Sequence, residues 1–235
     1  MDISSYQRYI SEETMMGPNS VRVLAELLER HPLRFATDRR ILDLGCGTGL
    51  TSLVIAKETG AKVYANDLWV SANENGRRFA QWGVSEQVLP VCEDANDLHF
   101  EKKLFHALVS IDSYHYFAGH EGFFQEKVLP FMKDGGEALI GIPGLKDEYA
   151  GRAEELLSGW LGDEAYMFQS QEQWRRLIGS HDRIESVKTW EMGCFREAWS
   201  EWLAADNEFS RSDRKYFETT IRPYTCFIGI YIKLK

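Results

Sequence analysis

The chain has 235 residues and a formal net charge of −9 at pH 7, with the apolar and charged fractions of a soluble globular protein. Its acidic balance without clusters of Lys or Arg excludes a strong affinity for a phosphate backbone, so nucleic acid is not an expected partner. It lacks the roughly 20-residue apolar run that a membrane span requires and an apolar signal core at its polar N-terminus, so we expect a cytoplasmic protein.

The first half of the chain alternates strand-like and helix-like segments. Short apolar runs predict strands, because strands buried in a parallel sheet are apolar on both faces. The expected strands are 40–44, 62–66, 87–92, 105–111, 137–142, 184–192 and 224–234. The expected helices are 6–16, 21–30, 50–58, 69–82 and 123–132, with mostly helical stretches at 145–180 and 195–221. This βαβαβ order predicts a doubly wound parallel sheet.

The most informative segment runs from Ile41 to Leu50, where a buried strand enters a glycine-rich turn that opens a helix. Glycines tolerate positive φ and allow a ligand to approach the backbone. Open α/β sheets bind ligands at this carboxyl edge. Asp67 ends the next strand, 20 residues after Gly47, where an acid can accept hydrogen bonds from ribose hydroxyls. The sequence therefore predicts a nucleoside-containing cofactor.

The glycine spacing distinguishes dinucleotides from other nucleoside-containing cofactors. Dinucleotide folds use G-x-G-x-x-G, whereas the glycines here fall as G-x-G-x-G at 45, 47 and 49. Asp43 precedes the first of them by two residues. The pattern resembles motif I of the class I S-adenosylmethionine (SAM)-dependent methyltransferases, D/E-x-G-x-G-x-G. That resemblance implies a Rossmann-like, doubly wound, mostly parallel seven-stranded sheet with an antiparallel last strand, plus a helical lid and insertions.

The resemblance implies a set of cofactor-binding residues. Asp43 and the turn would hold the methionine end, Asp67 the ribose, and Leu68 one adenine face. Asp94 and the backbone of Ala95 would read the adenine edge, and the segment after the fourth strand would lie beneath the methionine. The complete expected set is Asp43, Gly45, Cys46, Gly47, Gly49, Asp67, Leu68, Asp94, Ala95, Ser110 and Asp112.

Tyr114, His115 and Tyr116 follow the fourth strand, nearest the transferable methyl in the resembled family. We expect these three residues to form the catalytic floor of the pocket. His115 is either a general base, since its ordinary pKa is near neutrality, or a residue that only packs there. The four scattered cysteines have no zinc spacing, so we expect no metal and at least partly buried thiols. The mixed charges of 210–218 predict a solvated face.

Outside the core, Met15 to Asn19 followed by a helix resembles the small-molecule branch, which holds the ubiquinone/menaquinone-biosynthesis and cyclopropane-fatty-acid-synthase-like methyltransferases. We expect one domain of 1–235. It would comprise an N-terminal helical lid (1–32), a SAM-binding core (40–142) and helical cap insertions (145–180 and 194–222). The expected reaction is methyl transfer from SAM to a small molecule by in-line displacement. The alternatives are a non-catalytic SAM-binding or partner-stabilising protein and an NAD-linked oxidoreductase. The sequence predicts no particular oligomeric state.

Overall fold

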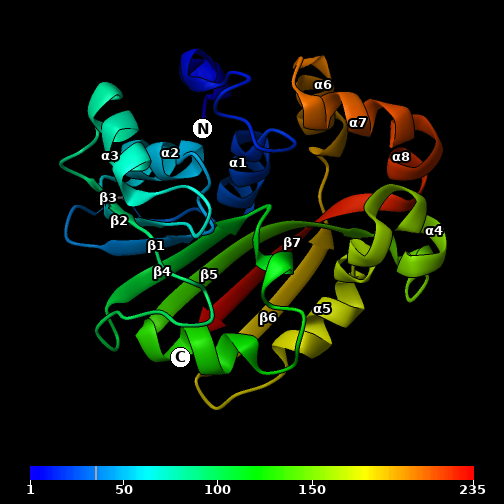
Figure 1. Ribbon diagram of the computed structural model, residues 1–235. Coiled ribbons are helices and arrows are strands. Elements are labelled where there is room, and N and C mark those ends of the chain that lie inside the picture. The colour runs from blue at the N-terminus through cyan, green and yellow to red at the C-terminus, as the bar shows by residue number, and fades with distance from the viewer. Residues whose placement is uncertain (35) are drawn as a thin grey trace.

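A seven-stranded sheet forms the centre of the computed structural model, which describes residues 1–34 and 36–235 (Figure 1). The strand order is β3-β2-β1-β4-β5-β7-β6. β7 pairs antiparallel with both β5 and β6, whereas the other neighbours are parallel. The strands are β1 (Arg40–Leu44), β2 (Lys62–Asn66), β3 (Val88–Val91), β4 (Phe105–Ile111), β5 (Met132–Leu145), β6 (Ile184–Glu191) and β7 (Thr225–Leu234). The predicted fold class, with its antiparallel last strand, is confirmed.

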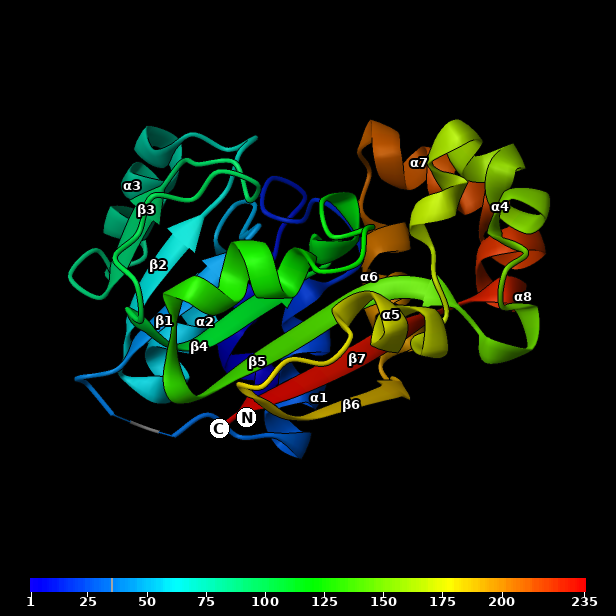
Figure 2. The ribbon, with the colours of Figure 1, turned by 90° about the horizontal axis from the view of Figure 1, so that it is seen from below.

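Helices cover both faces of this sheet. They are α1 (Ser20–Arg30), α2 (Leu50–Thr59), α3 (Ala72–Gln81), α4 (Ala153–Leu161), α5 (Gln171–Ile178), α6 (Phe195–Ala204), α7 (Glu208–Tyr216) and α8 (Arg222–Tyr224). Figure 1 shows α1, α2 and α3 on one face and α5 on the other. Figure 2 shows α4, α6, α7 and α8 gathered at one end of the molecule, where β5 ends and β7 begins. These four helices form what we term the cap.

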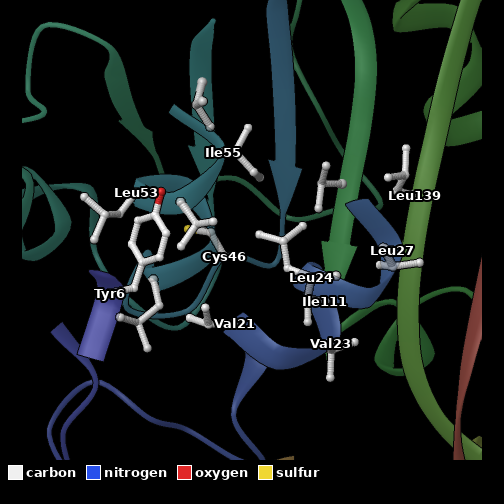
Figure 3. Packing of buried hydrophobic residues seen from close by; sticks show 14 of the residues in the cluster. Tyr6, Val21, Val23, Leu24, Leu27, Cys46, Leu53, Ile55, Ile111 and Leu139 are labelled. Carbon is white, nitrogen blue, oxygen red and sulfur yellow. The ribbon is translucent and has the colours of Figure 1, made fainter. Parts of the chain in front are cut away.

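The first strand and its two flanking helices fix the carboxyl edge of the sheet. In β1 every residue but the first is buried. α1 buries Val21, Val23, Leu24 and Leu27, and these side chains pack with those of α2 and the sheet in one apolar cluster (Figure 3). Each buried aliphatic side chain contributes about 1.5–3 kcal/mol to stability. The turn between β1 and α2 therefore starts from a rigid support.

The N-terminal segment differs from the helix predicted for 6–16. A 3₁₀ helix covers Ile3–Tyr9 and turns follow it. The Thr14 hydroxyl donates to the Tyr9 carbonyl at 2.7 Å and accepts from the Ser11 amide at 2.9 Å. Such local side-chain bonds compete with helical backbone bonding, and they end the helical segment before residue 16.

Three other expectations were also wrong in detail. The segment expected to be a helix over 123–132 is a π-helical turn, Phe124–Val128, followed by a 3₁₀ turn that contains Pro130. Pro130 lacks an amide hydrogen and therefore ends regular α-helical bonding. β5 extends beyond the expected 137–142 because it pairs with β7 as far as Leu145. Cys92 is exposed, although the other three thiols are at least partly buried.

The N-terminal region and the cap are joined by polar contacts. The Asn19 amide donates to the Ala198 carbonyl at 3.1 Å, and Glu201 accepts hydrogen bonds from the side chains of Asn19 and Arg22. These bonds tie the start of α1 to α6. Within the described residues, the helices are all too short or too polar to cross a membrane.

Candidate functional site

A cavity of about 290 Å³ opens at the carboxyl ends of β1, β2 and β4. The loops after these strands form its floor and sides, and Thr14 to Gly17 of the N-terminal segment form a further wall. This is the edge at which open α/β sheets bind ligands, because the strand-end loops and helix N-termini converge there. The cavity is therefore the candidate active site.

The glycine turn lines this cavity at positions 45 to 47. Gly45 has φ +75°, and a Cβ atom there would lie 2.4 Å from the Ser113 side chain. Gly47 has φ +54°, and its Cβ would lie 2.9 Å from the Met16 sulfur. L-residues with side chains rarely adopt such φ angles. Gly49, in the same left-handed region, is the N-cap of α2.

Asp67 holds the turn from the neighbouring strand end. Its Oδ2 accepts the Gly47 amide at 2.7 Å, and its Oδ1 accepts the amides of Trp69 and Val70 at 2.8 and 2.9 Å. A carboxylate has about four acceptor positions, so these three bonds leave capacity for a ligand. The predicted pair Asp67 and Leu68 both line the cavity.

Asp43 lies beneath the turn and outside the cavity lining. It is fully buried, and its Oδ2 accepts the hydroxyls of Thr51 and Ser52 at 2.7 and 2.6 Å. Its Oδ1 has no partner among the described residues. Burial raises the pKa of Asp43 to about 6, while the two hydroxyl bonds oppose that rise. Asp43 therefore ties the end of β1 to the first turn of α2.

The remaining predicted cofactor residues divide into two groups. Asp94 and Ala95 line the cavity, and the Asp94 carboxylate accepts from the Asn96 amide at 2.8 Å. Asp112 also lines it. Ser110 does not line it, because it is fully buried and donates to the Leu44 carbonyl at 2.7 Å. Cys46 lines the cavity, and burial raises its thiol pKa.

Asp112 differs from the other acids around the cavity. Its φ is +53°, a strained value for a residue with a side chain. Its carboxylate receives no hydrogen bond from the described part of the chain, and a Cβ on Gly17 would lie 2.7 Å from its Oδ2. Burial, followed by the charge of Asp213, raises its pKa to about 7. It is thus a carboxylate held close to the N-terminal wall without a partner.

The three predicted catalytic residues are not brought together at the cavity. Tyr116 lines it, and its ring meets Trp69 edge to face with centroids 5.2 Å apart. Tyr114 is 1% exposed and packs against Phe123 and Trp174. His115 is 4% exposed, its Nδ1 has no partner among the described residues, and burial lowers its pKa to about 3.

One cap residue that the sequence assigned to a solvated face belongs to this region. Asp213 on α7 accepts the indole N–H groups of Trp160 and Trp202, each at 2.8 Å. Its charge raises the pKa values of Asp112 and Tyr116. No local sequence pattern predicts these two indole–carboxylate bonds, because Trp160 and Trp202 lie 53 and 11 residues from Asp213 along the chain.

The charged residues of the cavity lining all have one sign. Asp67, Glu93, Asp94 and Asp112 line it, and the described lining contains no Lys, Arg or His. Two N-terminal contacts escaped prediction as well: the Thr48 hydroxyl donates to the Thr14 carbonyl at 2.6 Å, and Met16 covers Gly47. Among the described residues, no group of His, Cys, Asp or Glu has the arrangement of a metal site.

Residues 41–136 match the family model described as a methyltransferase domain. This segment includes the glycine turn, Asp67 and the loop after β4. The matched segment is a methyltransferase domain, and the sheet topology is the fold that the resemblance to class I SAM-dependent methyltransferases implied.

Solved structures support the same fold at low sequence identity. The geranyl diphosphate C-methyltransferase of Streptomyces coelicolor A3(2), in complex with Mg²⁺, geranyl diphosphate and S-adenosyl-L-homocysteine, is 17% identical with a TM-score of 0.70, covering 89% of this chain and 78% of that one. A geranyl diphosphate methyltransferase in complex with SAM is 16% identical, with a TM-score of 0.68 and coverage of 91% and 84%.

A third similar structure comes from a longer protein. The phosphoethanolamine N-methyltransferase 2 of Haemonchus contortus, in complex with S-adenosyl-L-methionine, is 21% identical with a TM-score of 0.71. The match covers 94% of this chain and 54% of that one, so this chain corresponds to about half of the longer enzyme. The first two of these enzymes are named for geranyl diphosphate and the third for phosphoethanolamine.

Proposed function

We propose that this chain transfers the methyl group of SAM to a small-molecule acceptor by in-line displacement, with SAM bound in the 290 Å³ cavity. The observation that carries the proposal is the bond between the Asp67 carboxylate and the Gly47 amide at 2.7 Å. This bond joins the proposed ribose-binding acid to the glycine turn, whose backbone would lie against the cofactor.

The glycine turn and the acidic lining of the cavity support SAM as its ligand. The turn carries no Cβ at Gly45 and Gly47, so a ligand can approach its backbone. In our proposal Asp67 accepts from the ribose, Leu68 covers one adenine face, and Asp94 and the Ala95 amide receive the adenine edge. Gly45, Cys46, Gly47 and Gly49 shape the methionine end, and Asp43 with Ser110 supports that end from beneath the cavity.

SAM supplies an electrophilic methyl group on a sulfonium centre. The protein's part is to hold the acceptor atom in line with the methyl carbon and to exclude water, an effect that is worth several kcal/mol. As the new bond to carbon forms, the C–S bond breaks and its electron pair stays on sulfur. Tyr116 and Asp112 line the cavity beside this path, whereas Tyr114 and His115 support the Tyr116 loop from the interior in our proposal.

The acidic lining disfavours an NAD-linked oxidoreductase. A dinucleotide brings a pyrophosphate, which α/β folds bind at a helix N-terminus with a G-x-G-x-x-G turn. The cavity offers four carboxylates and, within the described chain, no cationic side chain in its lining. A sulfonium suits this environment better than a pyrophosphate does.

We further propose that the chain is a single domain in which 1–32 forms a wall of the cofactor cavity and the cap lies over its acceptor side. The N-terminal wall is supported by the Thr48–Thr14 bond at 2.6 Å. The cap's share is supported by Asp213, whose charge reaches Asp112.

The first prediction concerns Asp67. Asp67→Ala should weaken S-adenosylhomocysteine binding by about 1.5–3 kcal/mol, the scale of hydrogen bonds to a charged group. Isothermal titration measures this directly. Asp97→Ala is the matched control, because the Asp97 side chain is 81% exposed and lies outside the cavity lining. Undiminished binding by Asp67→Ala would remove this residue from the ribose role. Tight cofactor binding without methyl transfer to any acceptor would favour the non-catalytic alternative.

A further inference from the structure

Within the described part of the chain, the loop after β4 leaves one cavity carboxylate, Asp112, without a counter-cation. Asp112 lines the cavity and receives no hydrogen bond from the described residues. The charge of Asp213 on α7, which lies outside the cavity lining, adds to the effect of burial and raises the pKa of Asp112. Two like charges near each other destabilise the folded chain unless a cation compensates for them.

Asp213 is held in place by rigid groups. The indoles of Trp160 and Trp202 donate to its two oxygens at 2.8 Å each. These bonds satisfy the carboxylate without neutralising its charge, because an indole N–H is a neutral donor. The charge of Asp213 contributes to the raised pKa values of Asp112 and Tyr116.

The other acids of the cavity are already engaged within the chain. Asp67 accepts three backbone amides. Glu93 accepts the His99 amide at 2.8 Å, and Asp94 accepts from Asn96 at 2.8 Å. Asp112 is the cavity acid that no such bond occupies, and its carboxylate reaches toward the N-terminal wall near Gly17.

Aromatic rings complete this part of the cavity. Trp69 and Tyr116 line it and contact each other, and Phe117 lines it beside them. Their faces attract cations. The nearest imidazole, on His115, adds no opposing positive charge, because burial lowers its pKa to about 3 and keeps it neutral near pH 7.

We infer that the methyl acceptor bears a cationic amine nitrogen and no phosphate group, and that Asp112 and the rings of Trp69 and Tyr116 recognise the nitrogen. This inference rests on the proposed function and specifies its acceptor. The recognition combines the unpartnered carboxylate on the cavity wall, the aromatic rings beside it, and a described lining without Lys or Arg that could bind a phosphate.

The chemistry of such an acceptor requires one proton to leave. An ammonium has no lone pair, so it first transfers a proton to the Asp112 carboxylate. The freed lone pair then forms the N–CH₃ bond while the C–S bond breaks, and its electrons stay on sulfur. A carboxylate with a pKa of about 7 can accept this proton near neutral pH.

The test measures ligand binding to the full chain saturated with S-adenosylhomocysteine. Choline is the cationic probe, 3,3-dimethylbutan-1-ol is its uncharged isostere, and phosphocholine is its phosphorylated counterpart. Choline cannot accept a methyl group at nitrogen, so it reports recognition alone. We expect choline to bind at least ten-fold more tightly than the alcohol and more tightly than phosphocholine.

Asp112→Asn should reduce the choline-to-alcohol ratio to three or less. Asp206→Asn is the matched control, because Asp206 is exposed, pairs with Arg211 and lies outside the cavity lining; its ratio should stay above ten. Equal binding of choline and the alcohol, undetectable choline binding, tighter phosphocholine binding, or an unchanged ratio in Asp112→Asn would each overturn the inference. Failure of S-adenosylhomocysteine to bind the wild-type chain would instead overturn the proposed function.

Discussion

At the residue scale, Asp112 is a site residue that lowers the stability of the fold. Its backbone has φ +53°, and its carboxylate receives no hydrogen bond from the described residues. Residues held in sparsely populated conformations cost on the order of 1–3 kcal/mol and cluster at functional sites. An acidic residue at position 112 therefore does not stabilise the fold. In our inference, Asp112 is present because it binds a positively charged ligand.

The pKa of Asp112 predicts how stability changes with pH. Burial and Asp213 raise the folded-state pKa to about 7, above the value of 3.8 for a free side chain. The folded state thus holds the proton more tightly than the unfolded state does, and wild-type stability falls as pH rises from about 4 to 7. Asp112→Asn removes this loss and should be more stable than wild type at pH 8 by on the order of 1–3 kcal/mol.

Denaturant unfolding at pH 4, 6 and 8 measures this difference. The advantage of the variant should be small at pH 4 and largest at pH 8, and Asp206→Asn should show no comparable increase. A difference between Asp112→Asn and wild type that is constant with pH would show that Asp112 titrates normally.

His115 is a second residue whose role depends on its environment. Because burial holds its pKa at about 3, it does not change charge between pH 5 and 8. Its ring packs against Tyr116 with centroids 4.1 Å apart. We expect His115→Ala to lower the methyl-transfer rate by loosening Tyr116, while the SAM dissociation constant stays within a few-fold of wild type.

The shape of the pH–rate profile distinguishes positioning from base catalysis. His115→Ala should keep the wild-type profile between pH 5 and 8 at a lower rate. Disappearance of an inflection in the variant would assign proton transfer to His115, and a collapse of SAM affinity would place the residue among the cofactor contacts.

At the element scale, the N-terminal segment is the part of the molecule that closes the cavity. Thr14 to Gly17 line the cavity, and Tyr6 donates a hydrogen bond to Glu58 on α2 at 2.6 Å. Met16 covers Gly47. The segment thus contacts the glycine turn and α2 from outside. Side-chain contacts attach it there.

Deleting residues 1–16 should therefore affect the site more than the fold. The remaining chain loses Tyr6 and Tyr9 from the apolar cluster but keeps α1 and the rest of the cluster around the sheet, so a folded protein that binds cofactor more weakly is expected. Methyl transfer should be lost because one wall of the cavity is missing. Far-UV circular dichroism, isothermal titration and a turnover assay separate these effects. Turnover of the truncated chain at the full-length rate would contradict the role of this wall.

At the scale of the whole molecule, one apolar cluster connects the N-terminal segment, the core and the cap. It runs from Tyr6 through the sheet to Trp202 and Phe227. Cap and core also share the bonds of Glu201 to Asn19 and Arg22. Such continuity favours cooperative unfolding.

We therefore expect a single thermal transition that shifts upward with ligand. S-adenosylhomocysteine at 100 times its dissociation constant should add about 2.7 kcal/mol of stability. For a chain of this size that corresponds to a rise in Tm of roughly 5–10 °C. Differential scanning fluorimetry with and without ligand measures the rise. A separate early transition for the cap would contradict the single-domain proposal.

The sequence by itself determined the fold and the cofactor region. The apolar strand before the glycine turn, the G-x-G-x-G spacing and Asp67 are local features, and their meaning depends on neighbours within about one βαβ unit. Short apolar runs predicted a doubly wound parallel sheet, because a buried parallel strand is recognisable from its own residues, and the resemblance to a family added the seven-stranded sheet with its antiparallel last strand. The ends of elements were less accurate, since local bonds such as Thr14 to Tyr9 and long-range pairing in β5 determine them.

Only the tertiary structure decided which of the predicted residues reach the cavity. Tyr114, His115 and Ser110 are near Asp112 and Tyr116 in sequence, yet they point into the interior, whereas Asp112 and Tyr116 line the cavity. Asp213 acquired its place through indoles on two other segments of the cap. The burial of a side chain and the charges around it depend on segments that come into contact only in the folded protein. A local sequence pattern therefore does not predict them.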